Sequence, residues 1–116
     1  IAMHHNNEAA QECIRECQQC FAACLENQTH CLPKGERHAA PDHIVALLDC
    51  ADAVSRAVFM LRQSPHHPQV CDVCAQVCDA CANSCEQIGD DERMRACADE
   101  CRRCAESCRQ MAAAAV

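Results

Sequence analysis

Cysteine carries the chemistry of this sequence, and its spacing is regular. The pattern C-x3-C-x2-C-x3-C occurs in CIRECQQCFAAC (residues 13–24), CAQVCDACANSC (residues 74–85) and CADECRRCAESC (residues 97–108). Alternating steps of four and three residues stay on one face of an α-helix, so each run predicts a helical stripe of thiols. Two sulfurs one turn apart can hold a single small ion. Thiolate sulfur is a soft ligand that selects Cu(I), zinc or iron–sulfur clusters.

Charge and geometry discriminate among these three kinds of metal site. Zinc held by four thiolates leaves a net charge of about −2 at each site, which is unfavourable when it is repeated in a low-dielectric interior. Cu(I) is monovalent, so a core of shared thiolates that holds nearly one ion per sulfur is neutral. Ferredoxin motifs take their ligands from loops and end in Cys-Pro, whereas no cysteine here precedes a proline. The pattern favours Cu(I), with an iron–sulfur electron-transfer protein and a zinc or thiol redox buffer as alternatives.

The cysteine count also raises the possibility of a disulfide framework, because fifteen cysteines in 116 residues are typical of small secreted proteins. The number is odd, which leaves at least one thiol unpaired, and the cysteines lie at helical intervals on the same segments. The first residues, IAMHHNNEAAQ, have neither the basic n-region nor the apolar h-region of an export signal. We therefore expect reduced thiols and a cytoplasmic protein.

Four helices are expected to position these thiols. Two glycines and four prolines divide the chain, and they predict helices at about 6–31, 41–64, 68–88 and 90–112. Asp90 and Asp91 are expected to cap the last helix, and Gly89 to follow the third. Short connections favour an antiparallel up-down-up-down arrangement. The expected fold is all-α, a four-helix bundle with a cysteine-lined core that forms a single domain over residues 1–116.

The helix at 41–64 differs from the other three, because its inward seam is ordinary and apolar and holds one cysteine, Cys50. On the other helices cysteine occupies almost the whole seam. Cysteine is much smaller than leucine, so facing stripes of cysteine would leave the bundle axis underpacked unless something else filled it. All the cysteines are therefore candidate metal ligands: Cys13, Cys17, Cys20, Cys24, Cys31, Cys50, Cys71, Cys74, Cys78, Cys81, Cys85, Cys97, Cys101, Cys104 and Cys108.

Histidine and methionine gather at the ends of the expected bundle. Thioether and imidazole groups are reasonable transient ligands for Cu(I). The topology collects several of them at one end: Met3, His4, His5, Met60, His66, His67 and Met111. We expect copper to enter there, mainly past Met60, His66, His67 and Met111. The opposite end is the rival mouth, and it contains His43 on the seam one heptad before Cys50.

Several classes of function are excluded by composition. The formal charge of −7 argues against a nucleic-acid partner or an anionic membrane. No apolar run approaches the length of a membrane span. No nucleophile–base arrangement or glycine-rich phosphate loop is present, so we expect a protein that is not an enzyme.

The three cysteine runs, on consecutive helices of a bundle, resemble the copper storage protein family over essentially the whole chain. This resemblance implies high-capacity binding of multiple Cu(I) ions, for copper detoxification or supply, in the cytosol. It also implies a homo-oligomer, commonly a tetramer, with copper chaperones or efflux proteins as partners. The principal ligands would be the C-x3-C pairs: Cys13 with Cys17, Cys20 with Cys24, Cys74 with Cys78, Cys81 with Cys85, Cys97 with Cys101, and Cys104 with Cys108. Cys31, Cys50 and Cys71 would add bridging or terminal ligands.

Overall fold

The computed structural model describes the backbone of residues 2–114 and the side chains of residues 8–113. Its helices are α1 (Ala2–Cys31), α2 (Pro41–Val54), α3 (Val58–Leu61), α4 (His67–Glu86) and α5 (Glu92–Ala114). Two short 3₁₀ turns, η1 (Leu32–Lys34) and η2 (Ser55–Ala57), follow α1 and α2. No strand occurs within residues 2–114. Met3, His4 and His5, expected at one end of the bundle, lie outside the described side chains.

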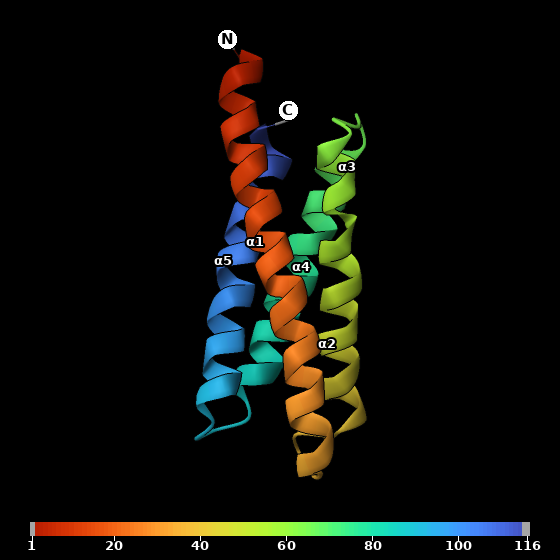
Figure 1. Ribbon diagram of the computed structural model, residues 1–116, viewed down its shortest axis with the longest axis vertical. Helices are drawn as coiled ribbons and strands as arrows, with labels where there is room; N and C mark the ends of the chain where they lie inside the picture. The colour runs from red at the N-terminus through yellow and green to blue at the C-terminus, as the bar shows by residue number, and fades with distance from the viewer. Residues whose placement is uncertain (1, 115–116) are drawn as a thin grey trace.

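The helices form an antiparallel four-helix bundle, in which α2, η2 and α3 together make the second rod (Figure 1). Around the axis α1 packs on α2, α2 on α4, α4 on α5, and α5 on α1. The molecule is elongated, with extents of 50 × 20 × 19 Å. We call the end that holds α3, the start of α4 and the end of α5 the α3 end, and the opposite end the η1 end. The all-α, up-down-up-down prediction is confirmed.

Local chemistry explains where the helices begin and end. After η1 the chain turns at Gly35, whose φ of 69° lies in the left-handed region that favours glycine. Asp91 caps α5, because its Oδ1 accepts hydrogen bonds from the backbone N–H of Arg93 at 2.9 Å and of Met94 at 3.2 Å. Asp90, expected as a second cap, instead adopts a left-handed φ of 60° in the turn before it.

The structure differs from the expected boundaries at three other places. α1 begins at Ala2, before the expected start at about residue 6. α4 ends at Glu86, so Gly89 does not directly follow the helix. The helix expected at 41–64 is interrupted by η2, where Ser55 Oγ donates a hydrogen bond to the Asp52 carbonyl at 2.6 Å. A serine that bonds back to the preceding turn competes with regular helix geometry and favours a tighter 3₁₀ turn.

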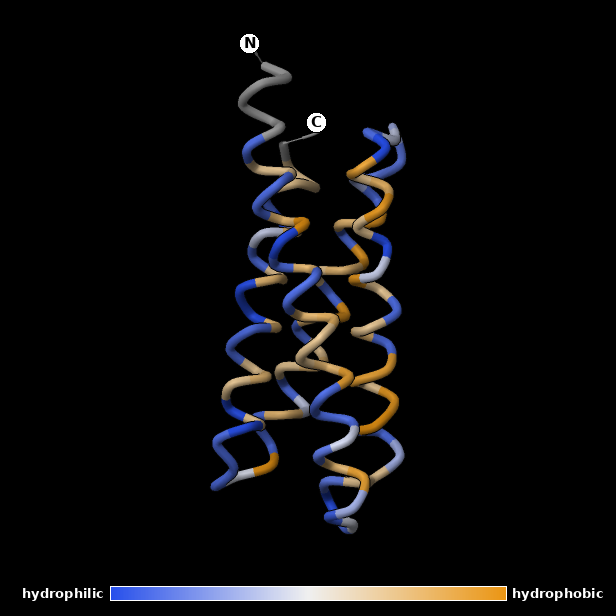
Figure 2. The backbone as a smooth tube through the Cα atoms, in the orientation of Figure 1, coloured by the Kyte–Doolittle hydropathy of each residue, from blue (hydrophilic) through white to orange (hydrophobic). Residues whose placement is uncertain are grey.

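The composition of the core differs from helix to helix. Leu47 and Val54 of α2 and Met94 of α5 are its largest fully buried side chains. Apolar residues are concentrated along α2 and α3, whereas α1 and α5 are mostly hydrophilic outside their cysteine seams (Figure 2). Alanines on α4 and α5 are buried and allow these two helices to approach closely: Ala75, Ala82, Ala98 and Ala105. The cysteine stripes of α4 and α5 are therefore brought together by small residues beside them.

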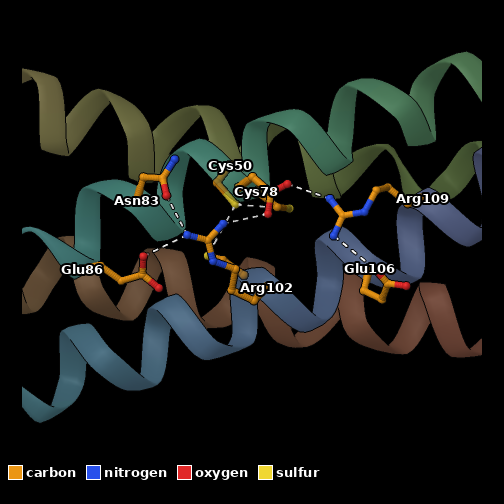
Figure 3. A network of polar contacts seen from close by, with 9 residues as sticks. Cys50, Cys78, Asn83, Glu86, Arg102, Glu106 and Arg109 are labelled. Carbon is orange, nitrogen blue, oxygen red and sulfur yellow. Dashed lines mark hydrogen bonds and ion pairs between the residues drawn. The ribbon is translucent and has the colours of Figure 1, made fainter.

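Charged side chains also tie α4 to α5 on the outside of the bundle. Arg102 of α5 donates hydrogen bonds to Asp79 at 3.0 Å, Asn83 at 2.6 Å and Glu86 at 2.9 Å (Figure 3). Arg109 donates to the other oxygen of Asp79 at 2.6 Å. Asp79 and Glu86 therefore take part in an ion-pair network that joins the two helices.

We expect the metal-free, reduced protein to be a folded helical bundle. Leu47, Val54 and Met94 bury conventional apolar surface that requires no metal, unlike zinc fingers, which are unfolded without it. Far-ultraviolet circular dichroism of the reduced protein in a chelator should show a strongly helical spectrum and a cooperative thermal transition. A coil spectrum that becomes helical only after addition of copper would contradict this expectation.

A buried carboxyl between α1 and α5 makes the stability of the metal-free bundle depend on pH. Glu100 is 7% exposed, and burial, followed by the neighbouring carboxyl of Glu16, raises the pKa of Glu100 to about 7, although Arg103 opposes the shift. Below pH 4.5, its ordinary pKa, the carboxyl is protonated in both the folded and the unfolded state, so its burial does not lower the stability of the fold. As the pH rises, the unfolded state gains from ionisation first, and the loss of folding stability is complete above about pH 7.

Glu100→Gln is therefore expected to stabilise the metal-free protein at pH 8 by about 2 kcal/mol, and by much less at pH 4. The measurement is chemical denaturation of both proteins at the two pH values. Glu106→Gln is the matched control, because Glu106 also pairs with an arginine three residues later but its side chain is 62% exposed. Equal effects of the two substitutions at pH 8 would show that burial of Glu100 is not the cause.

Candidate metal centre

All fifteen cysteines lie on helices, are free thiols and are buried. Cys74 is the most exposed of them, at 4%. The four-and-three spacing places each stripe on the inward face of its helix, and the antiparallel packing brings the stripes of α1, α4 and α5 around one axis. α2 adds a single thiol, Cys50, to this column. The axis of the bundle is therefore lined with sulfur, as the sequence predicted.

Several short distances between sulfurs join different helices. Cys20 Sγ lies 3.6 Å from Cys50 Sγ, which in turn lies 3.7 Å from Cys78 Sγ. Cys13 Sγ lies 3.7 Å from Cys108 Sγ. A metal–thiolate bond is about 2.3 Å long, so two sulfurs that share an ion are separated by at most about 4.6 Å. These contacts between helices therefore meet the spacing of a shared ion without large movement.

Four groups of sulfur atoms each lie within 4.8 Å of one another, close enough to hold a metal ion. The groups are Cys20, Cys24, Cys50 and Cys101; Cys24, Cys81, Cys97 and Cys101; Cys13, Cys17 and Cys108; and Cys20, Cys78 and Cys104. Three thiols, Cys20, Cys24 and Cys101, belong to two groups each. Three of the groups therefore share thiolates that can bridge neighbouring ions, and the group of Cys13, Cys17 and Cys108 adjoins them because Cys17 Sγ lies 3.7 Å from Cys104 Sγ.

The arrangement differs in part from the C-x3-C pairs that the family resemblance implied. Three of the six pairs each fall in one group: Cys13 with Cys17, Cys20 with Cys24, and Cys97 with Cys101. Cys78, in contrast, is grouped with thiols of α1 and α5, and the Cys74 thiol donates a hydrogen bond to the Ala53 carbonyl at 2.9 Å. Spacing within one helix could not reveal the cross-helix groups, because these depend on how the helices are rotated against each other.

At the α3 end, soft ligands continue the sulfur column outward. Cys71 Sγ lies 3.7 Å from Met60 Sδ. Met60, His67 and Met111 line a cavity of about 340 Å³ at this end. The Nδ1 atom of His67 is buried and has no hydrogen-bond partner. The structure thus brings together three of the four residues expected at the mouth, whereas His66 is exposed and does not line the cavity.

At the η1 end, a second set of mixed ligands closes the column. Cys31 Sγ lies 3.5 Å from His43 Nε2 and 3.7 Å from Met94 Sδ. His43 Nδ1 lies 2.7 Å from Ser84 Oγ, a partner that sequence reasoning missed because only the packing of α2 on α4 creates it. Burial lowers the pKa of His43, which favours the neutral imidazole that metals require. His43 is 3% exposed, so it lies inside this end.

Most thiols in the column retain their protons until a metal displaces them. Burial raises the pKa of Cys31 to about 11. Four thiols are different. Hydrogen bonds, first of all that from Cys108, hold the pKa of Cys13 well below the usual value, although burial opposes this, and neighbouring thiols also lower the pKa of Cys20, Cys97 and Cys101. A thiolate near the α3 end is thus available as a first ligand. Metal binding must release protons from the other thiols, so affinity should rise with pH.

A helical bundle whose axis is a chain of buried thiol sites defines a class of soft-metal-binding protein rather than an enzyme. The family model described as copper storage protein matches residues 6–113. The chain therefore belongs to the copper storage protein family, whose members store copper and do not catalyse a reaction.

Solved structures are similar to nearly the whole chain. A protein of Nitrosospira multiformis is 43% identical with a TM-score of 0.86, over 92% of this chain and 97% of that one. Copper storage protein 3 from Bacillus subtilis, in its apo form, is 34% identical with a TM-score of 0.80, over 89% and 98%. A cytosolic copper storage protein from Streptomyces lividans, with five coppers, is 31% identical with a TM-score of 0.88, over 95% and 97%. Among curated protein sequences, none matches this chain.

Proposed function

We propose that this chain stores and buffers Cu(I), many ions at a time, on the thiolates of its core. The observation that carries the proposal is the chain of overlapping sulfur groups, in which Cys20, Cys24 and Cys101 each serve two groups. Bridging thiolates allow nearly one monovalent ion per sulfur with little net charge. A structure of the Streptomyces lividans protein loaded with 10 copper equivalents is 30% identical to this chain, with a TM-score of 0.80.

The proposed ligands are all fifteen cysteines, with different roles. Members of the four sulfur groups are the main ligands. Cys71 and Cys31 are terminal ligands, each paired with a methionine, and His43 is an additional ligand at the η1 end. Cys74 and Cys85 lie outside the groups and join the sites only after their thiols reorient.

The two alternative functions fit the geometry less well. An iron–sulfur cube takes its ligands from loops that wrap around it, whereas every cysteine here lies on a helix. Zinc sites of four thiolates would share Cys24 and Cys101 between two divalent ions in a buried core. Such sites would keep a net negative charge away from water, which is costly.

Copper reaches this core, in our proposal, at the α3 end. Met60, His67 and Met111 line the cavity there, and Met60 Sδ lies 3.7 Å from Cys71 Sγ. Weak ligands in such a cavity lower the cost of leaving water or a carrier before the ion meets a thiolate. At the η1 end a cavity of about 290 Å³ is lined by His43, but by no methionine or cysteine among the described residues, so it offers fewer soft ligands to an entering ion.

An anaerobic titration tests the proposed function. Reduced protein is titrated with Cu(I) against a chelating competitor, with elemental analysis and a count of the protons released. We expect a stoichiometry far above the roughly four metals per chain that separate tetrahedral thiolate sites would allow, with protons released throughout. A brown protein with acid-labile sulfide, or saturation at a few ions, would reject Cu(I) storage.

We also propose that the protein acts in the cytoplasm and exchanges copper with chaperones or efflux proteins, for detoxification or supply. No helix in the described part of the chain is long and apolar enough to cross a membrane. Cell fractionation, with copper sensitivity of a strain that lacks the protein, tests location and role. Sensitivity to excess copper indicates detoxification, and loss of cuproenzyme activity in limiting copper indicates supply.

A homo-oligomer, and specifically a tetramer, is proposed to form through the outer faces of α1 and α2. Phe21 and Leu25 of α1 are 39% and 40% exposed, and Val45 and Leu48 of α2 are 51% and 39% exposed. Exposed apolar side chains on neighbouring helices favour a contact with another chain. Changing Phe21 and Leu48 to glutamate should yield monomers in analytical ultracentrifugation, whereas Val73→Glu on α4 should not. Parent protein that sediments as a monomer would refute the proposal.

A further inference from the structure

Two histidines and an aspartate meet at the η1 end, outside the sulfur column. His30 lies in the last turn of α1, His38 in the loop before α2, and Asp91 directly before α5. The Nε2 atoms of His30 and His38 lie 2.9 Å and 2.7 Å from the same atom, Asp91 Oδ2. The three side chains are 13%, 21% and 12% exposed, so the cluster is largely covered but still reaches solvent.

The carboxylate of Asp91 is held in place by the fold. Its Oδ1 accepts the capping hydrogen bonds from the backbone of α5, which directs Oδ2 toward the imidazoles. The rings of His30 and His38 meet edge to face, with centroids 5.9 Å apart, so both can present Nε2 to one point. Hydrogen bonds from His30 and His38 hold the pKa of Asp91 well below its usual range, although burial opposes this shift. The carboxylate therefore stays ionised.

We propose that His30, His38 and Asp91 form a separate site for a divalent ion of borderline softness, Zn²⁺. Their ligand atoms all lie within 4.8 Å of one another. Zinc binds imidazole nitrogen at about 2.0–2.1 Å and carboxylate oxygen at about 2.0–2.2 Å. Opening the two short contacts by several tenths of an ångström admits the ion, and water completes its coordination from the exposed side.

The chemistry of this site separates it from the copper core. It offers two nitrogens and one oxygen, which suit zinc, whereas soft thiolates select Cu(I). Cys31 follows His30 in sequence, but its sulfur points to His43 and Met94 in the core. The core and the external site are therefore expected to bind different ions in the same molecule.

Zinc binding to the thiols has to be separated from binding to this site, so the test compares variants that keep every cysteine. Parent, His38→Ala and Asp91→Asn are dialysed against Zn²⁺ with a competing chelator, and bound zinc is measured by elemental analysis. Asparagine retains the capping ability of residue 91. One arm uses metal-free reduced protein and the other uses protein first saturated with Cu(I).

We expect the parent to bind about one Zn²⁺ per chain more than either variant in both arms. Imidazole resonances of His30 and His38 should shift in the parent on zinc addition, and zinc should raise its melting temperature more than that of the variants. His66→Ala is the matched control, because His66 is an exposed histidine at the α3 end, and it should bind zinc like the parent.

Equal zinc binding by the parent and both variants in the two arms would overturn the proposal and leave an ion-pair cluster only. Helix content of each variant, measured by circular dichroism, identifies any variant that fails to fold. If one fails, His30→Gln replaces it and the same difference of one ion is required. If the protein did not store Cu(I), the arm with copper-saturated protein could not be run. The arm with metal-free protein would still test the zinc site.

Discussion

Replacing Cys24 and Cys101 together with alanine is expected to produce the largest loss of copper capacity from any two thiols in the chain. Both residues belong to both of the four-sulfur groups, so the change leaves two sulfurs in each group. Because bridging thiolates set the ratio of monovalent ions to sulfurs, we expect the loss of roughly two to four Cu(I) per chain. The measurement is the anaerobic Cu(I) titration with elemental analysis.

The matched control removes two thiols that lie outside the four groups, Cys74 and Cys85. It should lose roughly one to two Cu(I), because the connected sites remain intact. Both double variants should keep the helical spectrum, since each substitution deletes one buried sulfur and costs on the order of 1 kcal/mol. Equal losses in the two variants would mean that all thiols contribute alike and that the overlapping groups do not organise the store.

Copper uptake is expected to slow by about tenfold or more when the soft ligands at the α3 end are removed. The variant is Met60→Leu, His67→Gln and Met111→Leu, and the methionine changes nearly conserve volume. These side chains line the cavity and Met60 contacts Cys71, so their loss removes the intermediate ligands before the first thiols. Stopped-flow transfer of Cu(I) from a chelate measures the rate, and the final stoichiometry should be unchanged.

Two controls locate the mouth. His43→Gln with Met94→Leu alters the soft ligands at the η1 end and should leave the uptake rate near that of the parent, because His43 alone of these two lines the cavity at that end. His66→Ala should also have little effect, since His66 is exposed and does not line the cavity. Unchanged uptake in the α3-end variant, with slow uptake in the His43 variant, would move the mouth to the η1 end.

The sequence by itself determined the fold class and the kind of chemistry. Steps of four and three residues place the cysteines of residues 13–24, 74–85 and 97–108 on one face of each helix, whatever the rest of the chain does. Proline and glycine mark the breaks between helices because their effect on the backbone is local and can be read from the sequence. Short connections make neighbouring helices antiparallel. A sulfur-lined axis followed from these local rules, as did the choice of soft metals. The interruption at Ser55 was missed, since the bond from its side chain to a carbonyl competes only weakly with the helix.

Only the tertiary structure decided which residues share a site. Which thiols form a group depends on how each helix is rotated and shifted along its axis. Packing sets both quantities, for example where buried alanines let α4 approach α5 closely. Those quantities place Cys78 with Cys20 and Cys104 rather than with Cys74, and bring Ser84 to His43. They also gather His30, His38 and Asp91 from segments up to 61 residues apart. Periodicity carries no information on such distances, because a side-chain face is a property of one helix, whereas a metal site is a property of several helices at once.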